Sequence, residues 1–205
     1  MRKRPDLYTN YKSESSIFST TTQKIWFVVL ILVSLFSPFY LSNYWMLLLT
    51  TSLLIAIASW GLNIVSGMAG QINLAHGVFV GVGTYTSAVL GGVETSSVIG
   101  FELDMILWLP ISGAAAALVG ILFSPVSARL KGLNLGLVTL AIVFIGAHFF
   151  SNLKFITGGA GLGRKAAKLK FLGVDLDSGI VLGNLILEKN DVIYYFSLIL
   201  CILLG

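Results

Sequence analysis

The sequence predicts an all-α fold, a polytopic membrane helix bundle with a broken helix region near residues 61–77. Of its 205 residues, 56% are hydrophobic and only 11% are charged, whereas a soluble domain carries about 25% charged residues. Such a chain has too few polar side chains to cover a soluble surface. The composition therefore excludes a disordered chain, a soluble enzyme and a nucleic-acid-binding protein.

The position of the charges divides the chain. Asp, Glu, Lys and Arg are absent from residues 25–93, 105–128, 132–153 and 192–205. A hydrocarbon core about 30 Å thick needs about 20 apolar residues per helix. The first stretch is thus long enough for about three crossings and the next two for one each. The last begins a crossing that it does not finish, so we expect the chain to be the truncated, N-terminal part of a larger protein.

Flanking residues set the bounds of the expected helices. Pro38 lies near the end of the first, a glycine-bearing segment separates the second from the third, and acidic residues between positions 94 and 104 precede the fourth. Arg129 and Lys131 close the fourth helix. The expected helices cover residues 25–40, 44–65, 72–90, 105–128 and 133–152, and a sixth begins near Asp191.

The polar segments define two further regions beside the membrane domain, which covers residues 25–205. Residues 1–24 form a basic tail that we expect in the cytoplasm, because Lys and Arg prefer cytoplasmic segments. A cleaved signal peptide is the alternative, but no small-x-small site follows the first apolar run. Residues 153–190 form a polar connection rich in glycine and charge.

The polar connection conflicts with the simplest membrane orientation. Full crossings from a cytoplasmic N-terminus place the acidic loop outside, Arg129 and Lys131 inside, and the connection outside. The connection nevertheless carries more basic than acidic residues, against the preference of Lys and Arg for the cytoplasm. Either this segment folds as an external domain, which we favour, or the glycine break is re-entrant and later orientations are reversed.

The break is the segment where we expect function. Gly67, Gly70 and Gly77 interrupt a charge-free stretch, and backbone freed inside a membrane is tolerated in protein or beside a water-filled cavity. Discontinuous helices therefore often mark transport pathways. We expect a new helix to begin near Gln71 with its positive dipole end toward the pathway. The candidate pathway residues are Asn63, Gln71, Asn73 and His76, with Thr139 in a later helix. A cytoplasmic turn or a lipid-facing segment are the alternatives.

The sequence offers little catalytic or cofactor chemistry. His76 and His148 are the only titratable groups within the charge-free helical segments, apart from the lone Cys201 and tyrosines, and no embedded acid can pair with them in a proton relay. Two distant histidines make a poor metal site, so we expect no metal and no cofactor. The glycine-rich residues 157–163 lack the Gly-Lys-Ser/Thr ending of a phosphate loop. Without embedded carboxylates, we expect transport energy to come from an ATPase on a separate chain.

Three segments together resemble the permeases of branched-chain amino acid ABC importers. The first comprises Gly61-Leu62-Asn63, Gly67 to Gly77 and Gly83-Thr84-Tyr85-Thr86; the second comprises Leu130 to Leu133 and Leu137 to Ala141; the third comprises Thr157-Gly158-Gly159 and Gly161-Leu162. They occur in the family's order. The N-terminal tail and first helix pair resemble the larger, LivM-type permease, whereas Leu74-Ala75-His76-Gly77 is closer to its smaller partner. Urea and short-amide importers share these signatures.

The resemblance implies a multi-pass permease domain in the inner (plasma) membrane, in contact with membrane lipid. Its implied partners are a second permease subunit, ATP-binding cassette ATPase subunits and an extracytoplasmic solute-binding protein. The chain itself is then no enzyme, and the residues that couple it to the ATPase lie beyond Gly205. A gradient-driven transporter or channel acting alone is the main alternative, and a membrane scaffold without a pore is the second.

Overall fold

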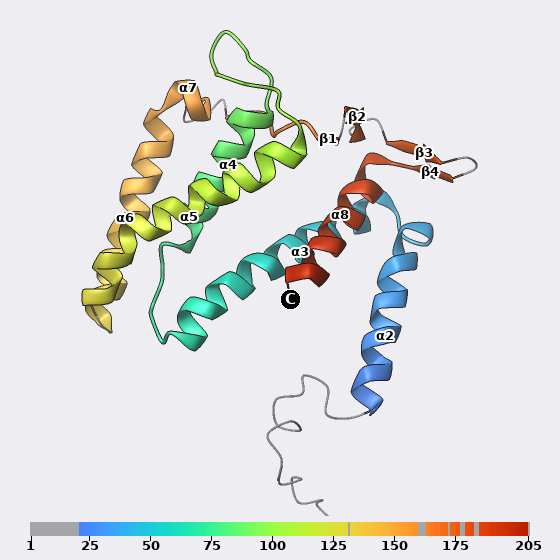
Figure 1. Cartoon of the computed structure of the whole chain (residues 1–205), viewed down its shortest axis with the longest axis horizontal. Helices are drawn as coiled ribbons and strands as arrows, with labels where there is room; N and C mark the ends of the chain where they lie inside the picture. Colours follow the sequence, from blue (N-terminus) through green and yellow to red (C-terminus); the bar gives the residue numbers. More distant parts are fainter. Residues whose placement is uncertain are drawn as a thin grey trace, which may run out of the picture. The chain divides into compact units, whose positions relative to one another are not determined.

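The computed structural model describes residues 21–130, 132–159, 163–171, 173–176, 179–182 and 185–204 (Figure 1). The chain divides into two compact units, one ending at Leu47 and the other beginning at Leu48. Helices dominate both, which confirms the predicted all-α membrane bundle. Residues 1–20, most of the predicted basic tail, lie outside the described residues.

The first unit contains α2 (Thr21–Phe36), the 3₁₀ turn η1 (Ser37–Phe39) and the start of α3 (Asn43–Asn63). The helix begins four residues before the predicted start at position 25, because polar Thr21 to Lys24 form its first turn. It ends earlier than predicted because the 3₁₀ turn, with Pro38 in its first turn, replaces the last part of the expected helix. Pro38 has no N–H with which to continue an α-helical ladder.

A π-helical turn, η2 (Ile64–Met68), follows α3. The Ala69 N–H donates to the Ile64 carbonyl at 3.2 Å, the i to i+5 pattern of a π-helix. The Asn63 side chain lies against the backbone of Gly67, where a Cβ atom would collide with its carboxamide oxygen. π-Helical turns are often found at functional sites, and here the turn leads directly into the predicted break.

The remaining helices of the second unit are α4 (His76–Gly91), α5 (Met105–Arg129), α6 (Leu133–Asn152), the short α7 (Lys154–Thr157) and α8 (Lys189–Leu204). Among the described residues, four helical segments are long and apolar enough to cross a membrane: 21–39, 43–68, 105–129 and 133–152. The helices α4 and α8 have 16 residues each, or about 24 Å at 1.5 Å per residue. The expected third helix is therefore shorter than predicted.

Glycines allow α4 to pack closely against α5 and α6. The ring of Phe150 from α6 lies over Gly81 of α4, and Val78 of α4 lies over Gly146 of α6. A Cβ atom added at Gly83 would lie 3.8 Å from Cβ of Ala116 in α5, an ordinary van der Waals contact. Small residues of this kind let membrane helices approach closely, where packing rather than the hydrophobic effect holds them together.

The loop of residues 92–104 and the first part of the polar connection lie at one end of this bundle, which we call the loop end. The Ile99 N–H donates to the Phe155 carbonyl at 3.1 Å, and the Lys168 N–H donates to the Gly91 carbonyl at 2.9 Å. The Arg164 guanidinium donates to the carbonyl of Ile156 at 2.9 Å and to that of Ile99. Burial lowers the pKa of Arg164 from its ordinary value, although a guanidinium stays charged in proteins.

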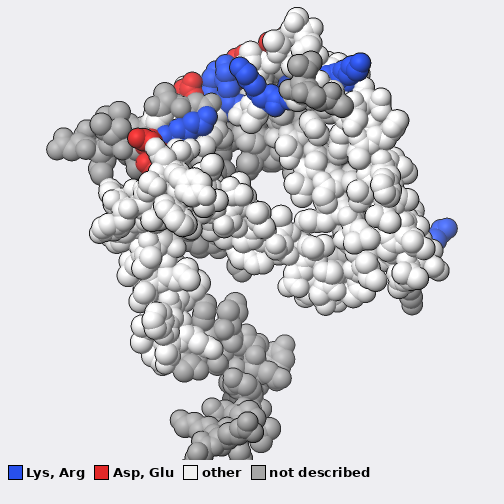
Figure 2. All heavy atoms as spheres, turned by 180° about the vertical axis from the view of Figure 1, so that it is seen from behind, with Lys and Arg blue, Asp and Glu red and all other residues white. Residues whose placement is uncertain are grey.

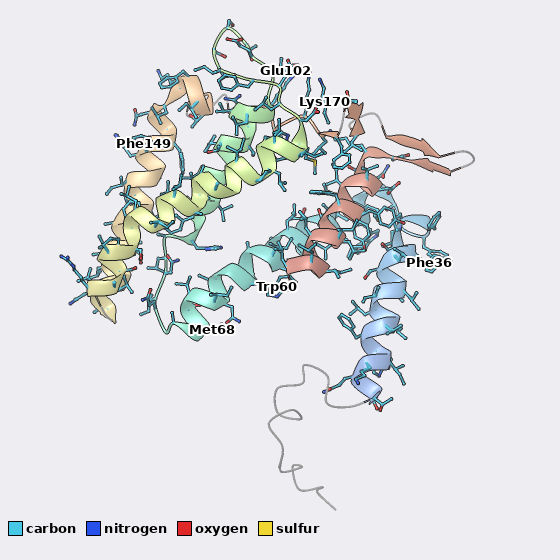
Figure 3. The ribbon with its side chains drawn as sticks, in the orientation of Figure 1. Phe36, Trp60, Met68, Glu102, Phe149 and Lys170 are labelled. Atoms are coloured by element: carbon cyan, nitrogen blue, oxygen red, sulfur yellow. The ribbon has the colours of Figure 1, made fainter. Side chains whose placement is uncertain are left out.

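Charge is concentrated at the loop end. Glu102 forms ion pairs with Lys168 at 3.7 Å and with Lys170 at 4.0 Å, and Figure 3 shows Glu102 and Lys170 on neighbouring segments. Figure 2 shows Lys and Arg side chains gathered along one edge, beside a broad surface without charged side chains. The basic residues of the connection are thus partly neutralised by the acidic loop, which supports placing both segments on the same side of the membrane.

Two small antiparallel hairpins in the connection were not predicted. One pairs β1 (Lys170–Phe171) with β2 (Val174–Asp175), and the other pairs β3 (Ile180–Leu182) with β4 (Leu185–Leu187). Two- and three-residue strands give too short an alternation to be recognised in a sequence. The opposite end of the bundle, which we call the turn end, carries the connection between α5 and α6 at Leu130 and Gly132.

The close packing of α4 on α6 predicts a large effect of one methyl group. In Gly146→Ala the added Cβ lies 2.7 Å from a methyl group of Val78, and overpacking of this kind costs about 1–3 kcal/mol. We expect a lower midpoint of thermal unfolding for the detergent-purified protein. Gly113→Ala in α5 is the control, because no atom lies within 4 Å of its Cβ position. Equal losses in both variants contradict the packing argument.

The hydrogen bonds of Arg164 predict that this residue holds the polar connection to the bundle. Arg164→Ala removes a donor to two carbonyl groups, and we expect faster cleavage of residues 163–188 by proteinase K in membrane vesicles. Glu102→Gln is the comparison. Its ion pairs are long and the Glu102 side chain is 42% exposed, so they contribute about 0–1 kcal/mol. Greater cleavage in Glu102→Gln than in Arg164→Ala contradicts this assignment.

Candidate functional site

The predicted break is present, but the new helix begins at His76 rather than near Gln71. Two local features explain the difference. Gly70 adopts a left-handed φ of 62°, which turns the chain out of a helical path. The Asn73 side chain then accepts a hydrogen bond from the Ala75 N–H at 3.0 Å. Asn often favours such local bonds over the helical ladder, so residues 70–75 remain irregular.

A single side chain fixes the irregular segment to α6. The Leu74 N–H donates to Oγ1 of Thr139 at 3.2 Å, and the same hydroxyl donates to the Gly136 carbonyl at 2.9 Å. Thr139 is six residues into α6, about 9 Å along the helix axis from its start. The irregular backbone therefore lies roughly two helical turns into the bundle from the turn end.

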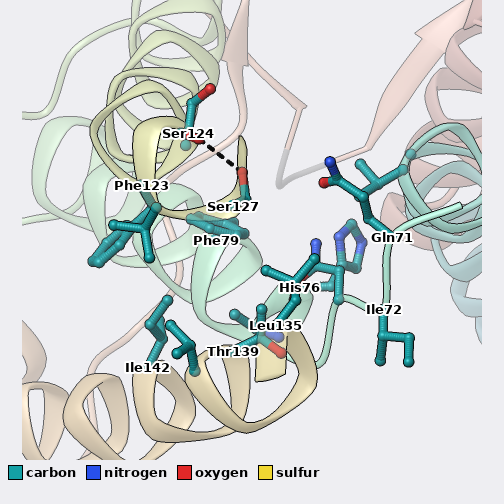
Figure 4. A pocket seen from close by; sticks show the side chains of 17 residues that line it. Gln71, Ile72, His76, Phe79, Phe123, Ser124, Ser127, Leu135, Thr139 and Ile142 are labelled. Atoms are coloured by element: carbon teal, nitrogen blue, oxygen red, sulfur yellow. Dashed lines mark hydrogen bonds between the residues drawn. The ribbon is translucent and has the colours of Figure 1, made fainter. Parts of the chain in front are cut away.

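A cavity of about 400 Å³ lies between the irregular segment and the surrounding helices (Figure 4). Its walls come from the end of α3, the break, the start of α4, the last third of α5 and the first half of α6. The lining residues are Gly61, Val65, Gln71, Ile72, Asn73, Ala75, His76, Phe79, Gly120, Phe123, Ser124, Val126, Ser127, Leu135, Val138, Thr139 and Ile142. This volume lies within the range of pockets that bind small molecules, about 300–1,000 Å³.

The cavity combines polar and apolar walls without fixed charge. None of the 17 described lining residues is Asp, Glu, Lys or Arg. Amides, an imidazole and hydroxyl groups are contributed by Gln71, Asn73, His76, Ser124, Ser127 and Thr139, while Phe79, Phe123 and Ile142 supply apolar surface. The arrangement can hydrogen-bond a small solute and shelter its apolar part.

His76 brings a buried, unused hydrogen-bonding atom to the cavity. Its Nε2 atom is buried and has no hydrogen-bond partner among the described residues. The imidazole lies beside Gly61 of α3, where a Cβ atom would be 3.7 Å from Cε1 of the ring. Because a buried polar atom without a partner costs about 1–3 kcal/mol, this nitrogen is available for a water molecule or a solute.

The structure brings together four of the five predicted pathway residues, Gln71, Asn73, His76 and Thr139. The fifth, Asn63, is exposed at the end of α3 and does not line the cavity. Among the predicted break glycines, Gly67 lies in the π-helical turn, Gly70 turns the irregular segment, and Gly77 falls in the first turn of α4. His148, the second histidine, is exposed near the far end of α6, next to Asn152.

The wall of the cavity that α5 forms was not predicted from the sequence. Gly120, Phe123, Ser124 and Ser127 recur at spacings of three and four residues, which places them on one face of a helix. Two serines on this face of an otherwise apolar helix are the signal that could have identified it. This signal is weak, because a serine in a membrane helix can satisfy its hydroxyl by bonding to its own backbone. The Ser127 hydroxyl does so by donating to the Ser124 carbonyl at 2.9 Å.

The three signature segments have different places in this architecture. Residues from the first segment and the second line the cavity, including His76 and Thr139. The third lies at the loop end, where Thr157 is buried and its hydroxyl donates to the Phe150 carbonyl at 2.7 Å. Its residues 160–162 lie outside the described residues. Two signatures thus contribute residues to the site, and the third lies at the opposite end of α6.

Comparisons with known proteins identify relatives of this chain. The chain is similar to LivM, the high-affinity branched-chain amino acid transport system permease protein of Escherichia coli strain K12, with 33% identity over 69% of this chain. The LivM protein of Salmonella typhimurium strain LT2 is 31% identical over the same share. The aligned region is 32% of each relative, so the chain spans about a third of the curated relatives it matches. No solved structure matches the chain.

The match to a family extends over nearly the whole described chain. Residues 44–204 match the family described as "Branched-chain amino acid transport system / permease component". This range contains the π-helical turn, the irregular segment and every residue that lines the cavity. The chain therefore belongs to the branched-chain amino acid transport system permease family.

Proposed function

We propose that this chain is part of a permease subunit of an ATP-driven importer, and that it moves branched-chain amino acids or similar small solutes through the cavity beside the helix break. The observation that carries the proposal is the uncharged cavity lined by Gln71, Asn73, His76 and Thr139. Membership of the permease family and the name of the LivM relatives support the substrate class.

The cavity suits an amino acid with an aliphatic side chain. Such a solute is a zwitterion, and its carboxylate can approach the start of α4, where the first N–H groups of a helix lack partners within the helix and carry partial positive charge. His76 Nε2 and the Gln71 carboxamide can hydrogen-bond its polar end. The rings of Phe79 and Phe123 offer apolar surface to the aliphatic part.

Weak binding at this site fits an importer whose solute is captured elsewhere. Without a fixed charge in its lining, the cavity cannot form a salt bridge with either end of a zwitterion. Weak binding favours release, and tight capture is left to an extracytoplasmic solute-binding protein. The polar loop end, with its hydrogen-bonded loop and connection, is the side on which we place that partner.

The helices α4, α5 and α6 lack the acidic residues that would point to an ion gradient as the energy source. Gradient-driven carriers usually place carboxylates or other ionisable groups within the membrane, and α4, α5 and α6 contain no Asp or Glu. We therefore assign the energy to ATP-binding cassette subunits on separate chains, together with a second permease subunit in the inner (plasma) membrane. This assignment agrees with a chain that performs no catalysis itself.

Transport by the full-length protein with its partner subunits tests the energy source. In proteoliposomes we expect uptake of radiolabelled leucine to require ATP, a functional ATPase and the solute-binding protein. Replacing ATP with a non-hydrolysable analogue is expected to abolish accumulation. Uptake that continues without ATP hydrolysis, driven by a proton or sodium gradient, contradicts the proposal and favours a transporter acting alone.

The two histidines provide a matched test of the cavity. His76→Ala removes the buried imidazole beside the break, and we expect the rate of uptake at low substrate concentration to fall about tenfold, the equivalent of about 1.4 kcal/mol. His148→Ala makes the same change at an exposed position outside the cavity and is expected to retain uptake within about twofold. Equal uptake by both variants at equal amounts in the membrane removes His76 from the pathway.

A further inference from the structure

A second, smaller cavity of about 240 Å³ lies next to the first, toward the turn end. Its walls are residues 69–71 at the start of the break, Ser127 and Ala128 at the end of α5, and Leu130, Gly132 and Leu135 where the chain enters α6. This cavity is farther from His76 and Thr139, neither of which lines it. It extends the space beside the break in the direction of Arg129, the basic end of α5.

Three residues line both cavities: Gln71, Ser127 and Leu135. Each comes from a different element, namely the irregular segment, the end of α5 and the start of α6. Because residues common to two cavities lie where the cavities meet, these three residues mark the boundary between the larger space and the smaller one. We call them the Gln71–Ser127–Leu135 barrier.

The three side chains of the barrier differ in how freely they can move. Leu135 is 4% exposed and sits in the first turn of α6, and the Ser127 hydroxyl is bonded to the Ser124 carbonyl of its own helix. Gln71 lies outside any helix, although its N–H donates to the Val65 carbonyl at 3.2 Å. Its side chain has three rotatable bonds and forms no hydrogen bond with the described residues. Gln71 is therefore the member that can move without unfolding a helix.

Little side-chain bulk lies beyond the barrier. Gly70 and Gly132 both line the smaller cavity, with left-handed φ values of 62° and 59°. A Cβ atom at either position would meet no atom within 4 Å. These two glycines come from different elements, and neither narrows the smaller cavity with a side chain.

We infer that the two cavities form a single route for the solute, and that the Gln71–Ser127–Leu135 barrier closes this route on the turn side until the Gln71 side chain swings aside. The route leads to the end that carries Arg129, which the distribution of Lys and Arg predicts to be cytoplasmic. The barrier is then the exit closure of the importer. The inference that a solute passes here rests on the proposed function, whereas the inferred closure between the two cavities does not.

Thiol labelling measures the closure without transport. In the full-length protein with its partners, without other reactive cysteines and with Cys201→Ser, we introduce either Ser124→Cys, which lies in the larger cavity only, or Ala128→Cys, which lies in the smaller cavity only. Both are labelled with the membrane-impermeant cationic reagent MTSET in vesicles that expose the turn end, without ATP or solute. The side from which Ala128→Cys is reached identifies the vesicle orientation.

We expect Gln71→Ala to raise the labelling rate of Ser124→Cys about tenfold and to leave that of Ala128→Cys within about twofold. Ile121→Cys on α5 is the control, because this side chain is 66% exposed on the outside of the helix and lines neither cavity. Its labelling rate is expected to be unaffected by Gln71→Ala. Leu135→Ala provides a second way to open the barrier if Gln71→Ala does not reach the membrane.

Unchanged labelling of Ser124→Cys in both barrier variants, with Ala128→Cys still reactive, overturns the inferred closure. The inferred closure is also overturned if Ser124→Cys is labelled as fast as Ala128→Cys when Gln71 and Leu135 are both unchanged. Faster labelling in the variants without any ATP-dependent uptake by the parent overturns the proposed function and leaves the closure standing. The two ideas therefore fail in different measurements.

Discussion

The hydrogen bond from the Leu74 N–H to Thr139 is the interaction on which the site depends. Inside a bilayer, backbone groups that leave a helix need partners in the protein or in a water-lined space. The Thr139 hydroxyl provides one such partner and is itself fixed to its own helix through Gly136. It holds the irregular segment about two turns deep against α6, and the cavity exists because the segment is held there instead of continuing as a helix.

Sequence patterns located most of the helices because the cost of charge in lipid fixes where helices can lie. The predicted bounds of the 133–152 helix agree with α6, and those of the 105–128 helix differ from α5 by one residue. The predicted start of α4 was wrong because the Asn73 side chain and left-handed Gly70 act locally, within a segment that contains no charged residue to mark the boundary. The strands of the connection are too short to give a periodic signal.

Only part of the candidate site could be predicted from the sequence, for a related reason. Polar residues stand out in a glycine-rich break, so Gln71, Asn73 and His76 could be selected from the sequence, and the family resemblance drew attention to Thr139. Whether a side chain faces inward depends on how helices rotate against one another, and this decided the outcome for Asn63 and for Ser127. The glycines that set this rotation, such as Gly81 and Gly146, are recognisable only once their partners Phe150 and Val78 are known.

The absence of formal charge from the described cavity lining has an electrical consequence. A membrane potential of 100 mV does about 2.3 kcal/mol of work on each elementary charge that crosses it. The proposed solute is a zwitterion without net charge, and the described lining contains no Asp, Glu, Lys or Arg to add charge as it rearranges. If the proposed solute passes through this cavity, its passage is nearly independent of voltage, and the direction of movement must come from conformational changes in the protein rather than from the field across the bilayer.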